Sequence, residues 1–135
     1  MAVLVDTGIL YALADADDRW HQPATAWLEG VSELLIVSVT ALPEVAYLLQ
    51  TRLGAPAELA FVQSLAAGEL DVEDLRRSDL VRCGEVMRRY PAIGFVDASL
   101  VAIAERLQIE AIATTDRRHF ESIRPKHTRT FRLLP

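Results

Sequence analysis

The sequence of 135 residues contains one cysteine, Cys83, and no apolar run that is long enough to cross a membrane. A single cysteine excludes an intrachain disulfide and is typical of a reducing compartment. The longest apolar stretch, Leu34–Leu49, is interrupted by Pro43 and Glu44, so it lacks the ~18–20 apolar residues of a transmembrane helix. A signal peptide requires a basic segment before its apolar run, and no such segment precedes the first apolar run of this sequence. These absences favour a cytoplasmic protein without a membrane anchor.

The composition is that of one folded domain. Hydrophobic residues make up 51% of the chain and charged residues 24%, which excludes intrinsic disorder. The sequence has no internal repeat, low-complexity segment or Gly/Ser linker. A chain of this length buries roughly two thirds of its unfolded surface, enough for a core without disulfides. We therefore expect a single domain that spans residues 1–135.

Short apolar runs alternate with longer helical patterns along the chain. Strands are predicted at Ala2–Val5, Leu34–Val39, Leu70–Val72, Ala111–Thr114 and Thr130–Leu134. Helices are predicted at Thr7–Ala14, His21–Leu28, from a Thr40 cap to about Leu53, from Pro56 to Gly68, from an Asp74 cap to Tyr90, and at Phe95–Leu107. Strands separated by helices imply right-handed crossovers and a mostly parallel sheet. The predicted fold class is a three-layer α/β/α sandwich.

Acidic residues gather at one predicted edge of this sheet. Asp6 follows the first strand directly, and Asp116 follows the strand at Ala111–Thr114. Glu44 lies one turn into the helix after the second strand, and Asp97 lies in the opening turn of the helix that precedes Ala111. Ligands of open parallel sheets bind outside the carboxyl ends of the strands. An Asp after a strand is also a common turn or cap residue, so the group carries the argument rather than any one member.

Two of these acids lie among apolar residues. Glu44 shares its predicted helix face with Tyr47 and Leu48, and we expect that face to be buried. Asp97 has apolar residues on both sides, and the next basic residue along the chain is Arg106. Burial of an unpaired carboxylate costs several kcal/mol. Both residues therefore need a partner that the neighbouring sequence does not supply.

A divalent cation would meet that need. Two unit charges ~4 Å apart at an effective dielectric constant of about 20 repel by roughly 4 kcal/mol, so converging carboxylates need protons or a cation. Oxygen ligands select Mg²⁺ or Mn²⁺. Zinc is disfavoured because one cysteine and three scattered histidines show no ligand spacing. A carboxylate-bound Mg²⁺ keeps positions open for water and phosphate, which points to phosphodiester hydrolysis.

The segments that carry these acids form a series that can be compared with known protein families. They are Val3-Leu4-Val5-Asp6-Thr7, the helix with Glu44, Phe95-Val96-Asp97-Ala98, and Thr114-Thr115-Asp116-Arg117-Arg118-His119-Phe120. Over the whole chain, in order and spacing, this series resembles the PIN-domain ribonucleases, and more narrowly the VapC toxins of bacterial toxin–antitoxin pairs. No single motif is specific to this family, but the combination of motifs is.

The resemblance implies a Mg²⁺- or Mn²⁺-dependent endoribonuclease that acts on transfer or ribosomal RNA. Carried over by position, Asp6, Glu44, Asp97 and Asp116 would form the acidic quartet. Asp6 and Asp97 would be the most direct metal ligands, Asp116 would hold a metal or its water, and Glu44 would orient or activate the attacking water. The resemblance also implies a homodimer and a cognate antitoxin. The Trp20–Trp27 and Leu48–Phe61 regions have enough apolar surface for an antitoxin groove, although core packing explains them equally well.

Three other functions compete with this one. Asp6-Thr7-Gly8 matches the Asp-Thr-Gly of aspartic proteases, but those are all-β proteins. Phosphotransferases of the haloacid dehalogenase type need Asp-x-Asp after a strand, and position 8 is Gly. The third alternative is a non-catalytic interaction module whose acids cap helices. Loss of RNase activity in EDTA would separate the enzyme from this module.

The net charge of the chain bears on the RNA hypothesis. There are 14 Lys and Arg residues against 19 Asp and Glu, a net charge of −5, which by itself argues against a nucleic-acid ligand. From Arg106 to the end, however, seven bases face three acids. Arg117, Arg118 and His119 follow Asp116 directly, so they are candidates for RNA contact or for a structural role. The arginines of the 76–89 segment form either a solvated face or a phosphate-binding surface.

Overall fold

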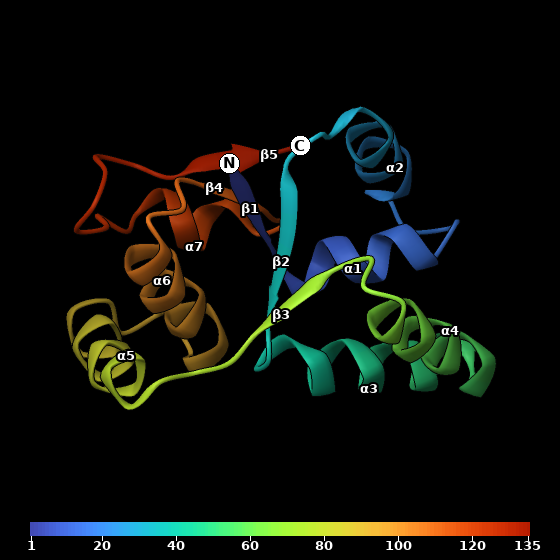
Figure 1. Cartoon of the computed structure of the whole chain (residues 1–135), viewed down its shortest axis with the longest axis horizontal. Helices are drawn as coiled ribbons and strands as arrows, with labels where there is room; N and C mark the ends of the chain where they lie inside the picture. The colour runs from blue at the N-terminus through green and yellow to red at the C-terminus, as the bar shows by residue number, and fades with distance from the viewer.

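A five-stranded parallel sheet divides the molecule into two helical layers (Figure 1). The computed structural model describes residues 1–135. The strands are β1 (Ala2–Val5), β2 (Leu34–Ser38), β3 (Asp71–Glu73), β4 (Ala111–Ala113) and β5 (Arg132–Leu134). Their order is β3-β2-β1-β4-β5, and all four pairings are parallel. The predicted α/β sandwich is confirmed, with a sheet that is wholly rather than mostly parallel.

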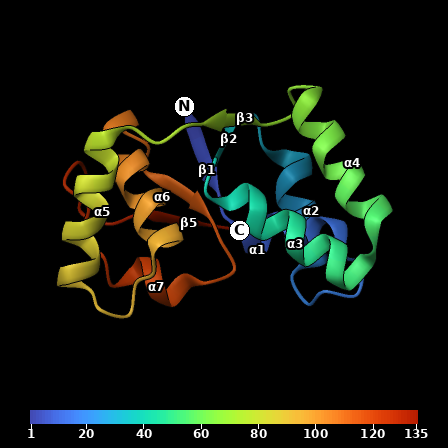
Figure 2. The same cartoon turned by 90° about the horizontal axis from the view of Figure 1, so that it is seen from below.

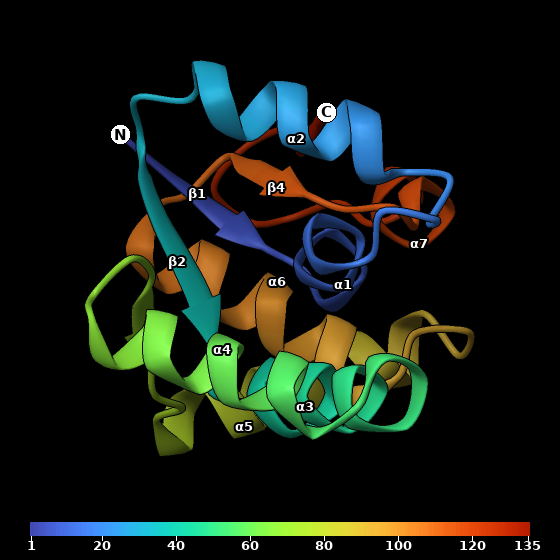
Figure 3. The same cartoon turned by 90° about the vertical axis from the view of Figure 1, so that its right-hand side faces the viewer.

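Seven helices cover the two faces of this sheet. They are α1 (Thr7–Ala14), α2 (His21–Gly30), α3 (Ala41–Leu53), α4 (Ala55–Ala66), α5 (Arg77–Arg89), α6 (Phe95–Leu107) and α7 (Arg117–Glu121). Helices α1 to α4 lie on one side, and α5 to α7 lie on the other (Figure 2). A side view shows α3 and α4 packed next to each other (Figure 3). None of the helices combines the length and apolar character of a membrane span.

Side chains that alternate in direction along each strand contribute to two hydrophobic cores, one on each face of the sheet. Leu4, Ile36 and Ile112 are buried toward the layer of α5 and α6. Val3 and Val37 are buried toward the layer of α1 to α4. Successive side chains of a strand point to opposite faces, so a strand covered on both faces must be apolar throughout. This is why the strands could be read from continuous apolar runs.

The start of α5 differs from the sequence prediction. The helix begins at Arg77, and the prediction of Asp74 as its cap is wrong. The Asp79 carboxylate instead accepts a hydrogen bond of 2.9 Å from the Arg76 backbone N–H, which caps the helix from within its first turn. Asp79 is 3% exposed and pairs with Arg106 Nη2 at 3.0 Å. The buried ion pair favours this later helix start, and local sequence does not reveal it.

Two further details depart from the predictions. Helix α7 occupies a segment for which no helix was predicted, because five residues are too few for a periodic pattern. Thr40 lies at the N-cap position of α3, as predicted, but its hydroxyl does not cap the helix. Thr40 Oγ1 contacts Ser38 Oγ and Ser99 Oγ, each at 2.7 Å.

The order of the strands brings β1 and β4 together at the centre. The chain runs outward from β1 to β2 and β3, then returns to the other side of β1 for β4 and β5. The Asp6 backbone N–H donates a hydrogen bond of 2.9 Å to the Ala113 carbonyl, which continues the β1–β4 pairing past the end of β1. Such a reversal leaves a crevice at the carboxyl ends of the central strands. The carboxylates predicted from sequence are in this region.

Candidate active site

A cavity of about 550 Å³ opens at the carboxyl edge of the sheet and is lined by all four acids predicted from the sequence. Asp6 follows β1, Glu44 lies on α3, Asp97 lies on α6, and Asp116 precedes α7. The other lining residues are Thr7, Gly8, Gly94, Phe95, Val96, Thr115 and His119. The structure therefore brings together four acids that are up to 110 positions apart in the sequence, from Asp6 to Asp116. Their catalytic roles remain predictions.

Asp6 is the most deeply buried acid of the cavity, with an exposed fraction of 6%. Its Oδ1 accepts a hydrogen bond of 2.8 Å from the Thr7 N–H, and its Oδ2 accepts one of 2.9 Å from the Thr114 hydroxyl. Burial, and after it the charge of Asp97, raises the pKa of Asp6 from 3.8 to about 6, although the two hydrogen bonds oppose the shift. The negative charge of Asp6 is thus costly in this site without a cation.

Thr114 is a positioning residue that sequence reasoning missed. It is fully buried, and besides donating to Asp6 its hydroxyl accepts a hydrogen bond of 3.0 Å from the Asp116 N–H. One hydroxyl thus joins the side chain of one acid to the backbone of another. The strand register explains the contact with Asp6, because Val5 pairs with Ala113 and Thr114 therefore lies opposite Asp6. That register was not readable from a single sequence.

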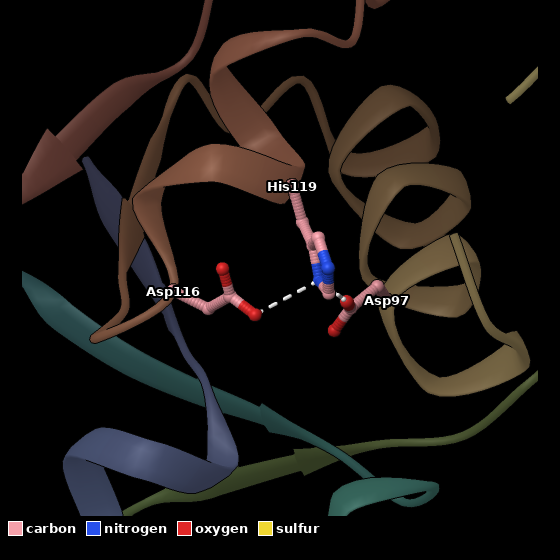
Figure 4. A group of neighbouring side chains, drawn as sticks. All are labelled: Asp97, Asp116 and His119. Atoms are coloured by element: carbon pink, nitrogen blue, oxygen red, sulfur yellow. Dashed lines mark hydrogen bonds and ion pairs between the residues drawn. The ribbon is translucent and has the colours of Figure 1, made fainter. Parts of the chain in front are cut away.

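His119 faces two of the acids (Figure 4). Its Nδ1 lies 2.7 Å from Asp97 Oδ2 and 2.9 Å from Asp116 Oδ2. Donor atoms of Asp97, Asp116 and His119 all lie within 4.8 Å of one another. Burial raises the pKa of Asp97 above its ordinary value, and the hydrogen bond with His119 opposes that rise. From the sequence, His119 is a candidate for RNA contact or for a structural role, because its i+3 spacing from Asp116 has meaning only once α7 is known.

The prediction that Glu44 lies on a buried face of α3 is wrong. The inward-facing residues of the helix are Ala41, Val45 and Leu49. Glu44 is exposed, as is Tyr47, although Glu44 still lines the cavity. Its carboxylate is therefore accessible to water and to a substrate.

A chain of hydroxyl groups joins the two helices that carry Glu44 and Asp97. Thr40 Oγ1 at the start of α3 contacts Ser99 Oγ of α6 at 2.7 Å. Ser99 Oγ donates a hydrogen bond of 2.6 Å to the Val96 carbonyl, one residue before Asp97. Ser99 is fully buried. This link holds the first turns of α3 and α6 together, and with them the two acids on opposite sides of the cavity.

The donor set fits a hard divalent cation. None of the four acids forms an ion pair with lysine or arginine, and His119 is the only basic partner of Asp97 and Asp116. The Thr7 hydroxyl, which also lines the cavity, is buried without a hydrogen-bond partner. Carboxylate oxygens are the ligands that Mg²⁺ and Mn²⁺ prefer, and a cation removes the mutual repulsion of the acids. Asp6, Glu44, Asp97 and Asp116 are the residues that could hold it.

Gly8 gives the loop before α7 the space that it needs. A Cβ at this position would lie 2.2 Å from Thr115 Oγ1 and 3.3 Å from Thr115 Cβ. We expect Gly8→Ala to push Thr115 and the adjacent Asp116 away, to lower the free energy of unfolding by about 1–3 kcal/mol, and to weaken Mn²⁺ binding. Thermal denaturation and calorimetric titration measure the two effects.

Gly84→Ala is the matched control, because a Cβ there meets nothing within 4 Å inside helix α5. This variant should gain about 0.5–1 kcal/mol of stability, since alanine is the better helix former, and should bind Mn²⁺ as the wild type does. Unchanged stability and metal binding in Gly8→Ala would mean that Thr115 turns aside without moving Asp116.

The basic residues divide into paired and free groups. Arg82 of α5 is engaged by Glu105, with Nε 2.7 Å from Oε1, and Arg117 donates a hydrogen bond of 3.1 Å to the Pro135 carbonyl. Arg118 is exposed next to His119 and forms no ion pair. Of the candidates for phosphate contact beside the cavity, Arg118 is therefore the one whose guanidinium group is available.

Comparisons with known proteins agree with this architecture. The family model of the PIN domain matches residues 3–124. Ribonuclease VapC26 of Mycobacterium tuberculosis is 31% identical over 135 residues, which cover 98% of this chain and 100% of that protein. The crystal structure of VapC20 from Mycobacterium tuberculosis, a toxin that cleaves the sarcin-ricin loop, has a TM-score of 0.76 at 24% identity and covers 82% of this chain and 86% of that one. A toxin–antitoxin complex from Klebsiella pneumoniae has a TM-score of 0.71 at 21% identity, with 90% and 92% covered. The chain belongs to the PIN-domain family and is a VapC-type ribonuclease.

Proposed function

We propose that this protein is the toxin of a toxin–antitoxin pair and that it cleaves structured RNA, transfer or ribosomal, with Mg²⁺ or Mn²⁺. The observation that carries the proposal is the cavity with four carboxylates and no lysine or arginine partner. PIN nucleases are metal-dependent, and the relative from Mycobacterium tuberculosis is named a ribonuclease. The cytoplasm is where such a protein would meet its RNA.

The roles of the four acids in this proposal follow from their burial. Asp6 and Asp97, the more buried pair, would bind the cation directly, and Asp116 would hold the cation or its water. Bound there, the ion supplies a Lewis acid for the phosphate oxygen and lowers the pKa of a bound water. Glu44 is exposed at the cavity and would orient the water that attacks phosphorus in line. We expect the bond from phosphorus to the 3′ oxygen to break and one proton of the attacking water to end on that oxygen, so the products would carry a 5′ phosphate and a 3′ hydroxyl.

Two exposed side chains suit an RNA strand at this cavity. Phe95 is 44% exposed, lines the cavity and belongs to neither core cluster. An exposed aromatic ring can stack on a base of any identity. Arg118 offers an unpaired guanidinium group to a phosphate. The exposure of Phe95 depends on the tertiary structure, so the sequence alone does not identify this ring as a stacking surface.

The test is an RNase assay on purified transfer and ribosomal RNA with Mg²⁺, with Mn²⁺ and with EDTA. We expect discrete fragments with 5′ phosphate ends in the presence of either ion and none in EDTA. Sequencing of RNA 5′ ends after induction of the protein, compared with the Asp6→Asn variant, would identify the RNA that is cut. Cleavage that persists in EDTA, or the absence of cleavage with both ions, would contradict the proposal. The second result would favour the non-catalytic interaction module.

We further propose that an apolar segment of the antitoxin occupies a groove lined by helices α1, α2 and α4 and that the toxin is a homodimer. The groove has a volume of about 450 Å³, and 12 of its 14 lining residues are hydrophobic. Trp27 of α2, Leu49 of α3 and Phe61 of α4 are among them, and they come from the two regions that the sequence had suggested. Similar folds have been solved in toxin–antitoxin complexes.

Ala60→Asp tests the groove. Ala60 is exposed on α4 and lines the groove, so the variant should fold normally. A carboxylate buried there without a partner costs several kcal/mol, and we expect the affinity for the cognate antitoxin to fall about tenfold or more in calorimetric titration. Ala66→Asp is the matched control, because Ala66 is exposed on the same helix outside the groove. Equal affinities of the two variants would exclude this groove as the antitoxin site.

A further inference from the structure

One nitrogen atom lies between two carboxylates in the candidate active site. His119 Nδ1 is 2.7 Å from Asp97 Oδ2 and 2.9 Å from Asp116 Oδ2 (Figure 4). Only the contact with Asp97 has the geometry of a hydrogen bond. A ring nitrogen carries either one proton or one lone pair, so it cannot donate a full hydrogen bond to each of two carboxylates. The contact with Asp116 therefore brings two atoms together without a proton between them.

A cation shared by the three side chains would account for both contacts. Ligands of one Mg²⁺ or Mn²⁺ lie about 3 Å apart, because each bond is about 2.1 Å long and neighbouring bonds are at right angles. The two separations, 2.7 and 2.9 Å, are close to that spacing. An ion between these side chains would be held by lone pairs of the imidazole nitrogen and of one oxygen from each carboxylate, and these donor atoms all lie within 4.8 Å of one another.

The imidazole of His119 has no polar partner other than these two acids. Its side chain is 37% exposed, and Nδ1 makes its contacts with Asp97 and Asp116 alone. One turn of α7 separates His119 from Asp116, so this short helix determines the approach of the ring to the acid. The other two histidines contact backbone carbonyls, His21 that of Ala12 and His127 that of Ile109.

We propose that His119 is a nitrogen ligand of the divalent ion and completes a cation site with Asp97 and Asp116. This inference rests on the proposed function, since it concerns the ion of the same site. Imidazole favours Mn²⁺ over Mg²⁺, which binds almost entirely through oxygen. The site therefore binds Mn²⁺ more tightly than a site with carboxylates alone.

Metal binding without RNA tests the ligand role independently of catalysis. Titration of the metal-free protein with Mn²⁺ and with Mg²⁺ gives the affinities. Pulsed electron paramagnetic resonance of bound Mn²⁺ detects a coordinated imidazole nitrogen. His119→Asn is the informative variant, because its side-chain amide keeps a hydrogen-bond donor near the position of Nδ1 but removes the imidazole. His21→Gln is the matched control on a histidine outside the cavity.

We expect the nitrogen signal in the wild type and in His21→Gln and its loss in His119→Asn. The dissociation constant for Mn²⁺ should rise about tenfold or more in His119→Asn, with a smaller change for Mg²⁺. Absence of the nitrogen signal in the wild type, together with equal Mn²⁺ affinities, would overturn the inference and leave His119 as a hydrogen-bond partner. Metal binding that Asp97→Asn abolishes would still support the proposed function in that case. A wild type that binds neither ion would overturn both.

Discussion

Asp97→Asn should lower the rate of RNA cleavage at least about 10³-fold and leave the protein folded. Asp97 occupies the centre of the site, because its charge acts on Asp6 while its Oδ2 contacts His119. An amide in its place keeps the shape of the side chain but removes the negative charge that attracts the cation. Loss of about 4 kcal/mol of transition-state stabilisation corresponds to this factor. Cleavage of a labelled RNA at saturating Mn²⁺ measures it.

Asp71→Asn is the matched control, since Asp71 is exposed at the amino end of β3 and does not line the cavity. It makes the same chemical change and should cleave RNA at the wild-type rate. Circular dichroism should give near-native spectra for both variants. An Asp97→Asn protein with wild-type activity would exclude Asp97 as a metal ligand, and it would remove the main support for the four-carboxylate mechanism.

The sheet edge could be predicted from the sequence because each signal there is local. A continuous apolar run followed directly by an acid, as in Val5–Asp6, identifies a buried parallel strand and the residue just past its end. A similar argument located Asp116, which lies three residues past the end of β4. Strand order depends on packing between distant segments, so the sequence does not show that β1 and β4 are neighbours. This pairing brings Asp6 and Asp116 together.

The parts that the sequence left open depend on contacts between distant segments. Asp79 favours the observed start of α5 through an ion pair with Arg106, 27 residues later. His119 faces Asp97 because α7 and α6 lie on the same side of the sheet. Glu44 could be assigned to the right helix but not to the right face, since its neighbours Tyr47 and Leu48 are apolar in sequence while Tyr47 is 59% exposed. Local patterns therefore gave the list of acids, and tertiary packing decides how each one is used.

Asp6→Asn should make the metal-free protein more stable at neutral pH while it removes cleavage. The pKa of Asp6 is raised from 3.8 to about 6, chiefly by burial and next by the charge of Asp97. Between these two values the folded protein keeps a proton that the unfolded chain has released. The free energy of unfolding therefore falls as the pH rises through this interval, by about 3 kcal/mol once the pH exceeds 6. Asparagine has no charge to bury, so the variant avoids this loss.

Thermal denaturation in EDTA at two pH values measures the effect. At pH 7.5 we expect the melting temperature of Asp6→Asn to exceed that of the wild type by about 10 °C, as about 3 kcal/mol implies for a chain of this length. At pH 4.5 the difference should shrink to about a third, because the folded wild type then carries the proton. Added Mn²⁺ should stabilise the wild type more than the variant, since only the wild type retains the Asp6 carboxylate as a ligand. A variant that is less stable than the wild type in EDTA at pH 7.5, by an amount independent of pH, would contradict this prediction. It would show that Asp6 stabilises the fold through its hydrogen bonds with Thr7 and Thr114 and does not destabilise it through a buried charge.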